Sequence, residues 1–310
     1  EACANPDFSG DKEVKVFITG GNGFVGTALT RFLLGEKHEV SVLVRSPKKS
    51  GHIPEAAKIV VGESTKAGKW QDSMSTHDLF INLAGANIFH RWDENYKKLL
   101  RSSRIETTRN LVEAIPCDST LLSVSAVGYY GFRGDEDLVE SSEPGNDFLA
   151  RLAVDWEKEA EKAKHKGVRV VITRFGVVLG ENGGALTQMI RPFRFFVGGP
   201  IGSGQQWMSW IHIQDLCRAA LFVAERERIE GPVNFVSPEP IKNKDLAKEI
   251  GSILGRPSFF RAPRFMIKLV LGELGSVILE GQKVVPGKLL ETGFSFRFPN
   301  LRPALESLVK

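Results

Sequence analysis

The chain has 310 residues, 42% of them hydrophobic and 25% charged, proportions that are ordinary for a soluble globular protein with a buried core. Lysine and arginine number 41 against 37 aspartates and glutamates, an excess of four without any run of five like charges, which is little argument for a nucleic acid or a membrane partner. Three widely spaced cysteines and the lack of any apolar run of about 18 residues argue against a disulfide framework, a metal site and a transmembrane segment.

The first residues of the chain are polar. Residue 1 is glutamate and residues 1–12 have no periodicity, which predicts a flexible tail at 1–13. This tail is either the stub left after removal of a targeting peptide or a remnant of cloning. The first alternative places the protein in an organelle matrix or stroma and the second leaves it cytoplasmic, and the cysteine pattern fits a reducing compartment in both cases.

The next segment has the order strand, glycine turn, helix, strand. Residues 14–19 (VKVFIT) and 40–44 are apolar, β-branched runs typical of buried parallel strands, and residues 27–35 have helical periodicity. Glycines in GxxGxxG spacing separate the first strand from the helix, which is the context that a dinucleotide-binding fingerprint requires. The alternative is a glycine-rich turn without a ligand.

Each glycine of this turn has an expected task. Gly20 allows a tight turn, Gly23 lets the backbone approach a pyrophosphate, and Gly26 lets the helix pack closely on the strand. The helix N-terminus offers free N–H groups to the phosphates. The residues predicted to bind the phosphates are Gly20, Asn22, Gly23, Phe24, Val25 and Gly26.

The end of the second strand indicates which dinucleotide is bound. NAD sites usually carry Asp or Glu there, which accepts a hydrogen bond from the ribose 2′-OH. This chain has Arg45 instead, with Lys48 and Lys49 nearby. A guanidinium matches a 2′-phosphate in shape and charge, so NADP is predicted over NAD. The alternative is that these residues are solvated loop charges.

Strands and helices continue to alternate along the chain. Strands are predicted at 78–86, 121–125 and 168–173, and helices at 95–114 and 148–164. This alternation predicts the α/β class, as a Rossmann-type doubly wound parallel sheet with a smaller C-terminal substrate lobe. We assign the sheet to residues 14–235, with a substrate-loop insertion at about 181–209. Leu83, Ala84 and Gly85 are expected to pass beneath the cofactor.

Residues 236–310 are predicted to form the small, mostly helical lobe. Its helices are expected at 243–254, 263–279 and 303–309. Arg261, Arg264 and Lys268 would either meet an anionic substrate or form a solvated face. A ligand is expected in the cleft between this lobe and the carboxyl edge of the sheet.

From residue 14 to residue 309 the chain resembles the extended short-chain dehydrogenase/reductases. The matching pieces are TGGNGFVG at 19–26, NLAGA at 82–86, Ser125 at the end of a strand, Arg174 before FGVVLG, and WIHIQDL at 210–216. Segments at 90–97, 103–108, 198–212 and 279–294 are similar to an atypical branch described as epimerase-like or as NADP-dependent oxidoreductases. The resemblance implies that Arg104 also reaches the cofactor, unless it is a helix-surface charge, and plastid members of the branch are linked to organelle division.

The chain departs from the family in its proton-transfer residues. The larger family uses a serine with a tyrosine and a lysine in a Tyr-x-x-x-Lys helix. None of the three tyrosines here is followed four residues later by lysine, and Phe148 and Leu152 stand near the expected places. The usual proton transfer is therefore not open to this chain.

Three hydroxyl groups are candidates for a relocated acid, namely those of Ser125, Tyr129 and Tyr130. Alternatively, both tyrosines pack the loop and their hydroxyls are hydrogen-bonded to backbone. Asp147 and Glu157 are further candidate acids, and Asp147 suits a helix N-cap equally well.

The substrate side also departs from the family. Met208 and Val177 stand where nucleotide-sugar enzymes commonly carry an arginine and an asparagine. With Trp207 and Trp210 nearby, we predict an apolar substrate pocket lined by these tryptophans and Met208; the alternative for the tryptophans is interdomain core. His212 is interpreted as a buried, hydrogen-bonded residue more readily than as a catalytic one.

The residue Asp215 is expected to cap a helix at 216–225.

Two functions are open for the chain as a whole. One is an NADP-dependent oxidoreductase or epimerase-like enzyme that acts on an unidentified small molecule with an unusual proton donor. The other is a non-catalytic NADP-binding protein, either a redox sensor or an assembly or organelle-division factor.

Overall fold

The computed structural model describes residues 13–47, 52–181 and 183–309. The tail predicted at 1–13 therefore lies outside the described residues except for Glu13, and so do Lys48 and Lys49. Within the described ranges no helix has the length and apolarity needed to cross a membrane.

A seven-stranded parallel sheet forms the centre of the molecule, in the order β11-β7-β5-β4-β1-β2-β3. Its strands are β1 (Lys15–Thr19), β2 (Glu39–Val44), β3 (Lys58–Val61), β4 (Leu79–Asn82), β5 (Thr120–Ala126), β7 (Arg169–Phe175) and β11 (Gly231–Phe235). The central strands are buried on both faces, which explains their near-continuous apolar sequences. The predicted Rossmann-type α/β class is confirmed.

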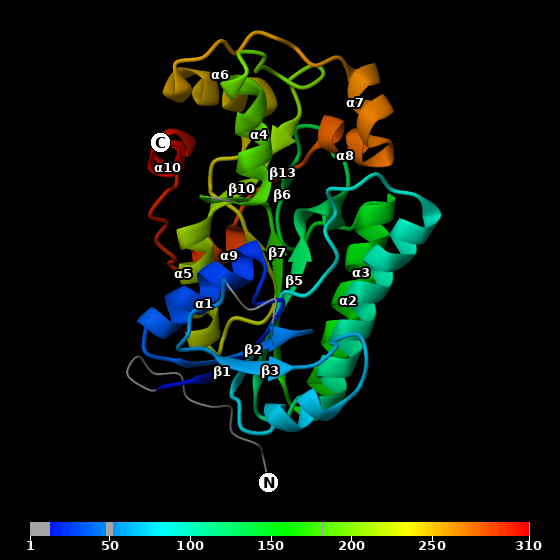
Figure 1. Ribbon diagram of the computed structural model, residues 1–310, viewed down its shortest axis with the longest axis vertical. Helices are drawn as coiled ribbons and strands as arrows, with labels where there is room; N and C mark the ends of the chain where they lie inside the picture. The colour runs from blue at the N-terminus through cyan, green and yellow to red at the C-terminus, as the bar shows by residue number, and fades with distance from the viewer. Residues whose placement is uncertain (1–12, 48–51, 182, 310) are drawn as a thin grey trace.

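Helices cover both faces of the sheet (Figure 1). On one face lie α1 (Phe24–Gly35) and α5 (Ile213–Glu225), whose apolar residues share a core cluster with Val16 and Ile18. On the other lie α2 (Glu94–Ala114) and α3 (Phe148–Glu161), which pack around Phe17 and Phe80. Because successive side chains of β1 point to opposite faces, one short strand supplies both cores.

A second group of helices lies at the carboxyl end of the strands, at the top of Figure 1. There α4 (Gly184–Arg194), α6 (Asn243–Leu254) and α10 (Leu301–Leu308) pack around the buried side chain of Trp210. The remaining helices are α7 (Arg264–Leu271), α8 (Glu273–Glu280) and α9 (Gly287–Glu291). Short strands join the loops, namely β6 (Asp137–Leu138), β8 (Val177–Leu179), β9 (Trp207–Met208), β10 (Trp210–His212), β12 (Ile241–Lys242) and β13 (Lys283–Val284).

Several elements differ from the predictions. Helix α1 begins at Phe24 rather than at residue 27, and the predicted helix 263–279 is divided at Gly272, whose φ of +62° ends α7. The segment predicted as a loop at 181–209 contains α4. The division of the chain at residue 235 stays a prediction, and Leu289 and Phe294 beyond it pack into the cluster that contains β11.

Candidate functional site

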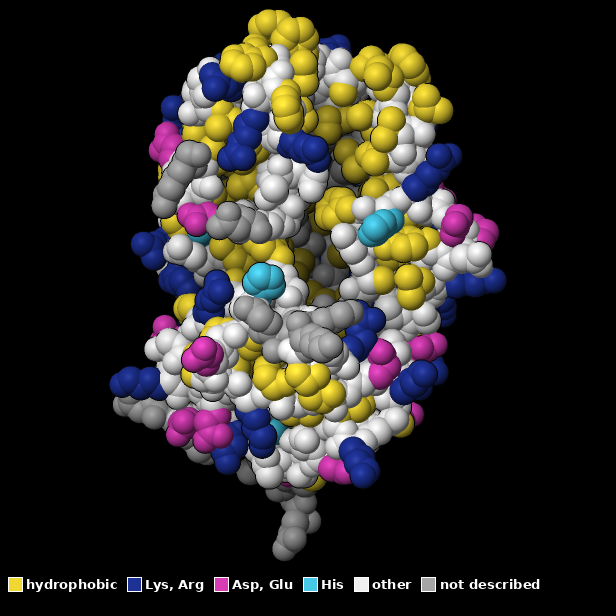
Figure 2. All heavy atoms as spheres, in the orientation of Figure 1, with side chains coloured by type: hydrophobic (Ala, Val, Ile, Leu, Met, Phe, Trp, Pro, Cys, Tyr) yellow, Lys and Arg dark blue, Asp and Glu magenta, His cyan; other side chains and the backbone are white. Residues whose placement is uncertain are grey.

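The site begins where the winding of the sheet reverses. From β1 the chain proceeds outward to β2 and β3, then returns to β4 on the other side of β1 and continues toward β11. At such a switch point the loops leaving the two neighbouring strands diverge and leave a crevice at the carboxyl edge. Figure 2 shows this face hollowed beneath the C-terminal helices.

The glycine turn occupies this edge. Gly20 has φ +70°, and a Cβ there would lie 2.8 Å from the carbonyl carbon of Leu83 and 2.9 Å from the nitrogen of Ala84. A Cβ on Gly26 would lie 2.4 Å from the Gly20 oxygen. The geometry agrees with a tight turn at Gly20 and close helix packing at Gly26. The loop that follows β4 therefore touches the turn that follows β1.

The N-terminus of α1 is open to a ligand. Gly23 is the N-cap and provides no side-chain cap, and the first turn has no acidic residue. The Gly23 N–H is bonded to the Gly20 oxygen at 3.0 Å, and Thr27 begins the intrahelical bonds with Gly23. The N–H groups of the first turn therefore lack intrahelical acceptors, and they lie at the positive end of the helix dipole.

The ring of Phe24 is enclosed by a second glycine-rich loop. A Cβ on Gly180, Gly183 or Gly184 would lie within 2.5 to 2.8 Å of a ring atom of Phe24. This loop joins β8 to α4, so the contact ties the start of α4 to the start of α1. Phe24 was predicted as a cofactor-binding residue; its ring serves as the contact between two loops, and its backbone N–H belongs to the open turn.

Two arginines flank the turn. Arg45 follows β2, is exposed, and forms no ion pair with any residue that the structure describes. The Arg104 side chain of α2 lies against Gly85, where a Cβ would be 3.0 Å from its Cζ. Its Nη1 donates to the Leu100 oxygen at 3.0 Å and its Nη2 to the Ala86 oxygen at 3.1 Å.

The side chain of Arg104 is half-buried. No carboxylate among the described residues pairs with it, and burial lowers its pKa to about 10. The guanidinium also lies 5.2 Å from the ring of Trp156. A guanidinium has five N–H donors, so donors remain for an anion beside the Gly85 loop. Arg104 therefore packs against the loop that follows β4, and its contact with the cofactor stays a prediction.

Ser125 lies at the end of β5 in a chain of charged hydrogen bonds. Its Oγ donates to Glu157 Oε1 at 2.6 Å. Arg174 donates to both oxygens of Glu157, from Nε at 2.9 Å and from Nη2 at 2.8 Å. Arg174 is 3% exposed and its pKa is raised by these bonds, against the lowering effect of burial. The proton of Ser125 therefore points to Glu157, and the lone pairs of its oxygen stay free.

The two adjacent tyrosines have different environments. Tyr130 is fully buried; its hydroxyl donates to Asn234 Oδ1 at 2.6 Å and accepts from Arg174 Nη1 at 3.0 Å. Burial raises its pKa to about 12. Tyr129 is half-buried, with its ring centre 3.5 Å from the Arg174 Cζ and no hydrogen bond from its hydroxyl within the described residues. Tyr130 as an accessible acid is therefore corrected to a core residue, whereas Tyr129 stays a candidate.

An apolar cluster surrounds Phe148 and Leu152, the residues expected near the positions of the family's tyrosine and lysine. Phe148 lies 5.5 Å from the ring of Trp92, and Leu152 is buried beside them. Leu274 of α8 completes the cluster. The C-terminal helices thus close against α3 through hydrophobic contacts, and α3 itself begins with Asp147, whose carboxylate caps it by accepting the Ala150 N–H. The capping interpretation of Asp147 is confirmed.

The prediction that Trp210 lines the substrate pocket is wrong. Its side chain is fully buried in the core cluster with α4, α6 and α10, and Nε1 donates to the Glu239 oxygen at 2.9 Å, which agrees with the alternative that it is a core residue. Trp207 is half-buried, with Lys242 Nζ 4.9 Å and Lys283 Nζ 5.1 Å from its ring. Met208 is half-buried in strand β9. Neither is brought to the Ser125 group by any contact that the structure gives.

His212 is buried and hydrogen-bonded, as predicted, and it also takes the capping role that was expected of Asp215. His212, not Asp215, is the N-cap of α5: its Nδ1 accepts the Gln214 N–H, so Nε2 carries the proton and donates to Ser307. Asp215 is buried within the first turn and accepts the backbone N–H groups of Arg297 and Phe298 at 2.8 Å each. The predicted cap is corrected because α5 begins three residues earlier than expected.

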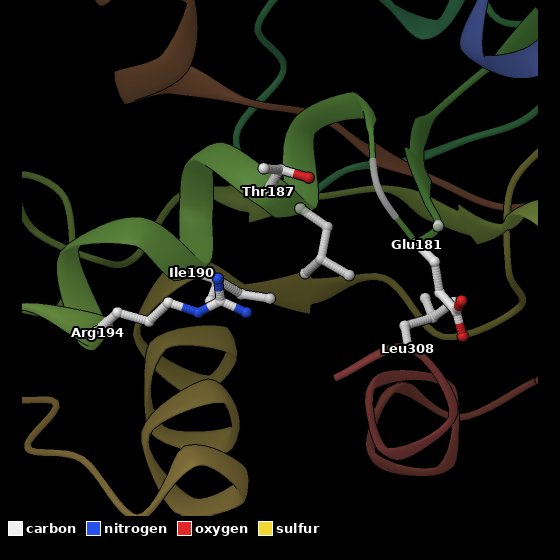
Figure 3. A pocket seen from close by; sticks show the side chains of 7 residues that line it. Glu181, Thr187, Ile190, Arg194 and Leu308 are labelled. Carbon is white, nitrogen blue, oxygen red and sulfur yellow. The ribbon is translucent and has the colours of Figure 1, made fainter. Parts of the chain in front are cut away.

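A cavity of about 300 Å³ lies between α4 and α10. Glu181 and Arg194 stand at opposite ends of it, with Ile190 beside Arg194 and Leu308 beside Glu181 (Figure 3). None of the residues predicted for the site lines it. Among the described residues no group of three or more His, Cys, Asp or Glu side chains is arranged to hold a metal.

Sequence reasoning missed a buried chain beneath the site. Thr19 donates to Asn82 Oδ1 at 2.7 Å, Asn82 donates to Thr108 at 2.8 Å, and Trp156 donates to the same Thr108 oxygen at 2.8 Å. This chain fixes the end of β4 against α2 and α3. Only the polar residue Asn82 at the end of an apolar strand could have indicated it.

Comparison with known proteins identifies relatives along the whole chain. The model of the NAD dependent epimerase/dehydratase family matches residues 16–236, and a domain of unknown function (DUF1731) matches residues 262–308. The epimerase family protein SDR39U1 homolog, chloroplastic, of Arabidopsis thaliana is 38% identical over 97% of this chain and 88% of its own length. Epimerase family protein SDR39U1 of Mus musculus is 39% identical over 96% of this chain and its full length.

A solved structure resembles the whole molecule. The crystal structure of human epimerase family protein SDR39U1 (isoform 2) with NADPH has a TM-score of 0.84 to this chain at 35% identity. The match covers 95% of this chain and 98% of the human one. The similarity therefore extends over both the sheet and the C-terminal helices.

Proposed function

Because the chain belongs to the NAD-dependent epimerase/dehydratase family, as an atypical, epimerase-like short-chain dehydrogenase/reductase, we propose that it binds NADP(H) at the switch point of its sheet. One observation carries the proposal: the turn at Gly20, with its open helix N-terminus, lies between two arginines that no described carboxylate neutralises. A dinucleotide with a 2′-phosphate supplies the missing anions. The human relative crystallised with NADPH supports the same assignment.

The residues present fit this cofactor. The first-turn N–H groups of α1 would hold the pyrophosphate, Arg45 the 2′-phosphate, and Arg104 would face the cofactor across Gly85. When bound, the cofactor supplies or accepts a hydride. The chain must then supply a group that donates or accepts one proton. The apolar side chains of the cluster around Phe148 cannot do this.

We place that route at Tyr129 and Ser125. The Tyr129 hydroxyl has no hydrogen-bonding partner among the described residues, and the Ser125 oxygen has free lone pairs because its proton is held by Glu157. In this assignment the Tyr129 phenol exchanges the proton with the reacting hydroxyl or carbonyl of the substrate, and Ser125 Oγ accepts a hydrogen bond from a second, non-reacting hydroxyl of the substrate. Glu157 is the positioning residue for Ser125. The reaction class is oxidation of an alcohol or reduction of a carbonyl on a small molecule.

The cofactor assignment is tested by titrating the protein with NADPH and with NADH and following tryptophan fluorescence. We expect Arg45→Ala to raise the Kd for NADPH about 10- to 100-fold, since one charge-assisted phosphate contact is lost, and to leave the Kd for NADH unchanged. Arg31→Ala, which removes an exposed arginine of α1, is the matched control. Equal effects on both nucleotides would exclude Arg45 from the 2′-phosphate site.

The catalytic assignment is tested with NADPH and a panel of aldehydes, ketones and quinones. Tyr129→Phe should lower kcat at least tenfold with an unchanged Kd for NADPH, because only the proton-exchanging group is removed. Glu157→Gln should weaken the Ser125 contact and raise KM more than it lowers kcat. A Tyr129→Phe variant with full turnover would contradict the assignment.

A non-catalytic NADP-binding protein is the second candidate, and the apolar cluster around Phe148 and Leu152 favours it. It predicts tight NADPH binding without turnover of any substrate in the panel. The Arabidopsis relative is described as chloroplastic, which supports an organelle stroma over the cytoplasm as the compartment.

A further inference from the structure

Large apolar side chains are exposed at the end of the molecule formed by α4, α6 and α7. They belong to residues 195–197 after α4, to Phe259 and Phe260 before α7, and to α7 itself. Their side chains are between 47% and 74% exposed. Single exposed apolar residues are ordinary, but a contiguous group of this size marks an interaction surface. We call this surface the apolar cap.

The two loops of the apolar cap are joined through their backbones. The Phe260 N–H donates to the Gly198 oxygen at 3.2 Å, and the Ala262 N–H donates to the Pro200 oxygen at 2.9 Å. The ring of Phe259 lies 4.6 Å from that of Phe260. Figure 2 shows apolar side chains over the top of the molecule on both sides of the hollow.

Helix α7 has no buried residue. Phe265, Met266, Leu269 and Val270 repeat at helical spacing, so they share one face, and they are 49% to 71% exposed. A short helix gains most of its stability from packing an apolar face. The apolar face of α7 is turned away from the rest of the described chain and is free to pack against something else.

The segments that carry the apolar side chains have only positive charges, whereas the charges of α6 beside them are balanced, with Lys244 and Lys248 against Asp245 and Glu249. Residues 184–208 and 256–272 contain six cations and no aspartate or glutamate. The cations are Arg191, Arg194, Arg256, Arg261, Arg264 and Lys268, all exposed and none in an ion pair with a described residue. Since the whole chain has an excess of four, the rest of it has a net charge of 4 − 6 = −2. The positive charge is thus concentrated where the apolar side chains are exposed.

We propose that the apolar cap docks the protein on a membrane surface that contains anionic lipids. Aromatic and aliphatic side chains beside arginine and lysine are the combination that enters the boundary between headgroups and acyl chains while the cations meet lipid phosphates. A second copy of the chain fits poorly, because two surfaces with six cations each would face one another. The inference is independent of the NADP site, which lies at the edge of the sheet.

The test uses the full chain and sedimented vesicles of pure phosphatidylcholine or of phosphatidylcholine with 30% phosphatidylglycerol, roughly a physiological anionic content. We expect binding to the anionic vesicles that weakens when salt is raised, and little binding to the neutral ones. Leu269→Glu should lower the bound fraction at least tenfold, because the charge opposes insertion of the α7 face. Leu99→Glu is the matched control, since Leu99 is 48% exposed on α2.

The cations are tested separately. Neutralising Arg261, Arg264 and Lys268 to glutamine should lower binding to anionic vesicles roughly a hundredfold, the equivalent of about 1 kcal/mol for each charge. Equal binding to both kinds of vesicle, binding that survives Leu269→Glu, or no binding at all would each overturn the proposal. So would a dimer in solution that Leu269→Glu dissociates, because a second copy would then be the occupant.

Discussion

His212 links the N-terminus of α5 to the C-terminal helix. Its Nδ1 must be unprotonated to accept the Gln214 N–H, and its ring lies 3.9 Å from that of Phe298. Burial lowers its pKa from 6.5 to about 4. Between pH 4 and pH 6.5 the unfolded chain binds more protons than the folded one. The free energy of unfolding therefore rises with pH over this range, and the protein loses this contribution to its stability as the pH falls.

Because of His212, we expect the free energy of unfolding to fall by up to about 3 kcal/mol between pH 6.5 and pH 4. His212→Asn keeps a capping oxygen without a titrating group, so its unfolding free energy should depend less on pH. Urea denaturation at a series of pH values measures this. His165→Asn removes an exposed histidine as the control, and identical pH slopes for wild type and His212→Asn would refute the expectation.

At the scale of elements, the other end of α5 is held by a buried arginine. Arg169 of β7 donates to the oxygens of Val223, Arg226 and Ile229 at 2.9 to 3.0 Å, and also to that of Ala224. A cation that satisfies the last carbonyls of a helix opposes the negative end of its dipole.

Arg169→Met should lower the free energy of unfolding by about 3 kcal/mol, because several buried carbonyls lose their donor. Equilibrium denaturation measures the loss. Arg228→Met, at an exposed position of the loop that follows α5, should change stability by less than about 0.5 kcal/mol. A loss below about 1 kcal/mol at Arg169 would mean that water replaces the guanidinium.

Most helices and strands could be predicted from the sequence, because the periodicity of each is visible within a short stretch of neighbouring residues. The helix at 243–254 matches α6 at both ends, and the turn at Gly20 was found because its glycines are adjacent. What failed depended on distant partners. The break between α7 and α8 depends on the positive φ of Gly272, which the residue type alone does not fix. Asp215 looked like a cap because its true partners, near Phe298, are more than 80 positions away.

The candidate site divides in the same way. The glycine turn and Arg45 could be proposed from the sequence because both lie within one short stretch, between the end of β1 and the residue after β2. The link between Ser125 and Glu157 spans 32 positions, and that between Tyr130 and Asn234 spans 104. A single sequence holds no signal that pairs such residues, so the burial of Tyr130 and the pairing of Glu157 with Arg174 required the fold.

For the whole molecule, Asp215 joins the C-terminal segment to the main core through the N–H groups of Arg297 and Phe298. Asp215→Ala would leave two donors unpaired, so we expect a loss of about 3 kcal/mol in the free energy of unfolding. Amide exchange at those two residues should accelerate more than exchange in β1. Asp245→Ala, an exposed aspartate in the first turn of α6, is the control. Unchanged exchange at residues 297 and 298 would show that the segment is held by other contacts.

The enclosure of Phe24 by Gly180, Gly183 and Gly184 makes two distant parts of the sequence depend on one another. Gly183 has a φ of −178°, extended backbone that any residue adopts, so conformation does not require glycine there; the volume of the Phe24 ring does. A larger residue at 183 becomes acceptable only with a smaller one at 24. The two positions therefore share a fixed sum of side-chain volume, and substitutions that are harmful singly can be neutral together.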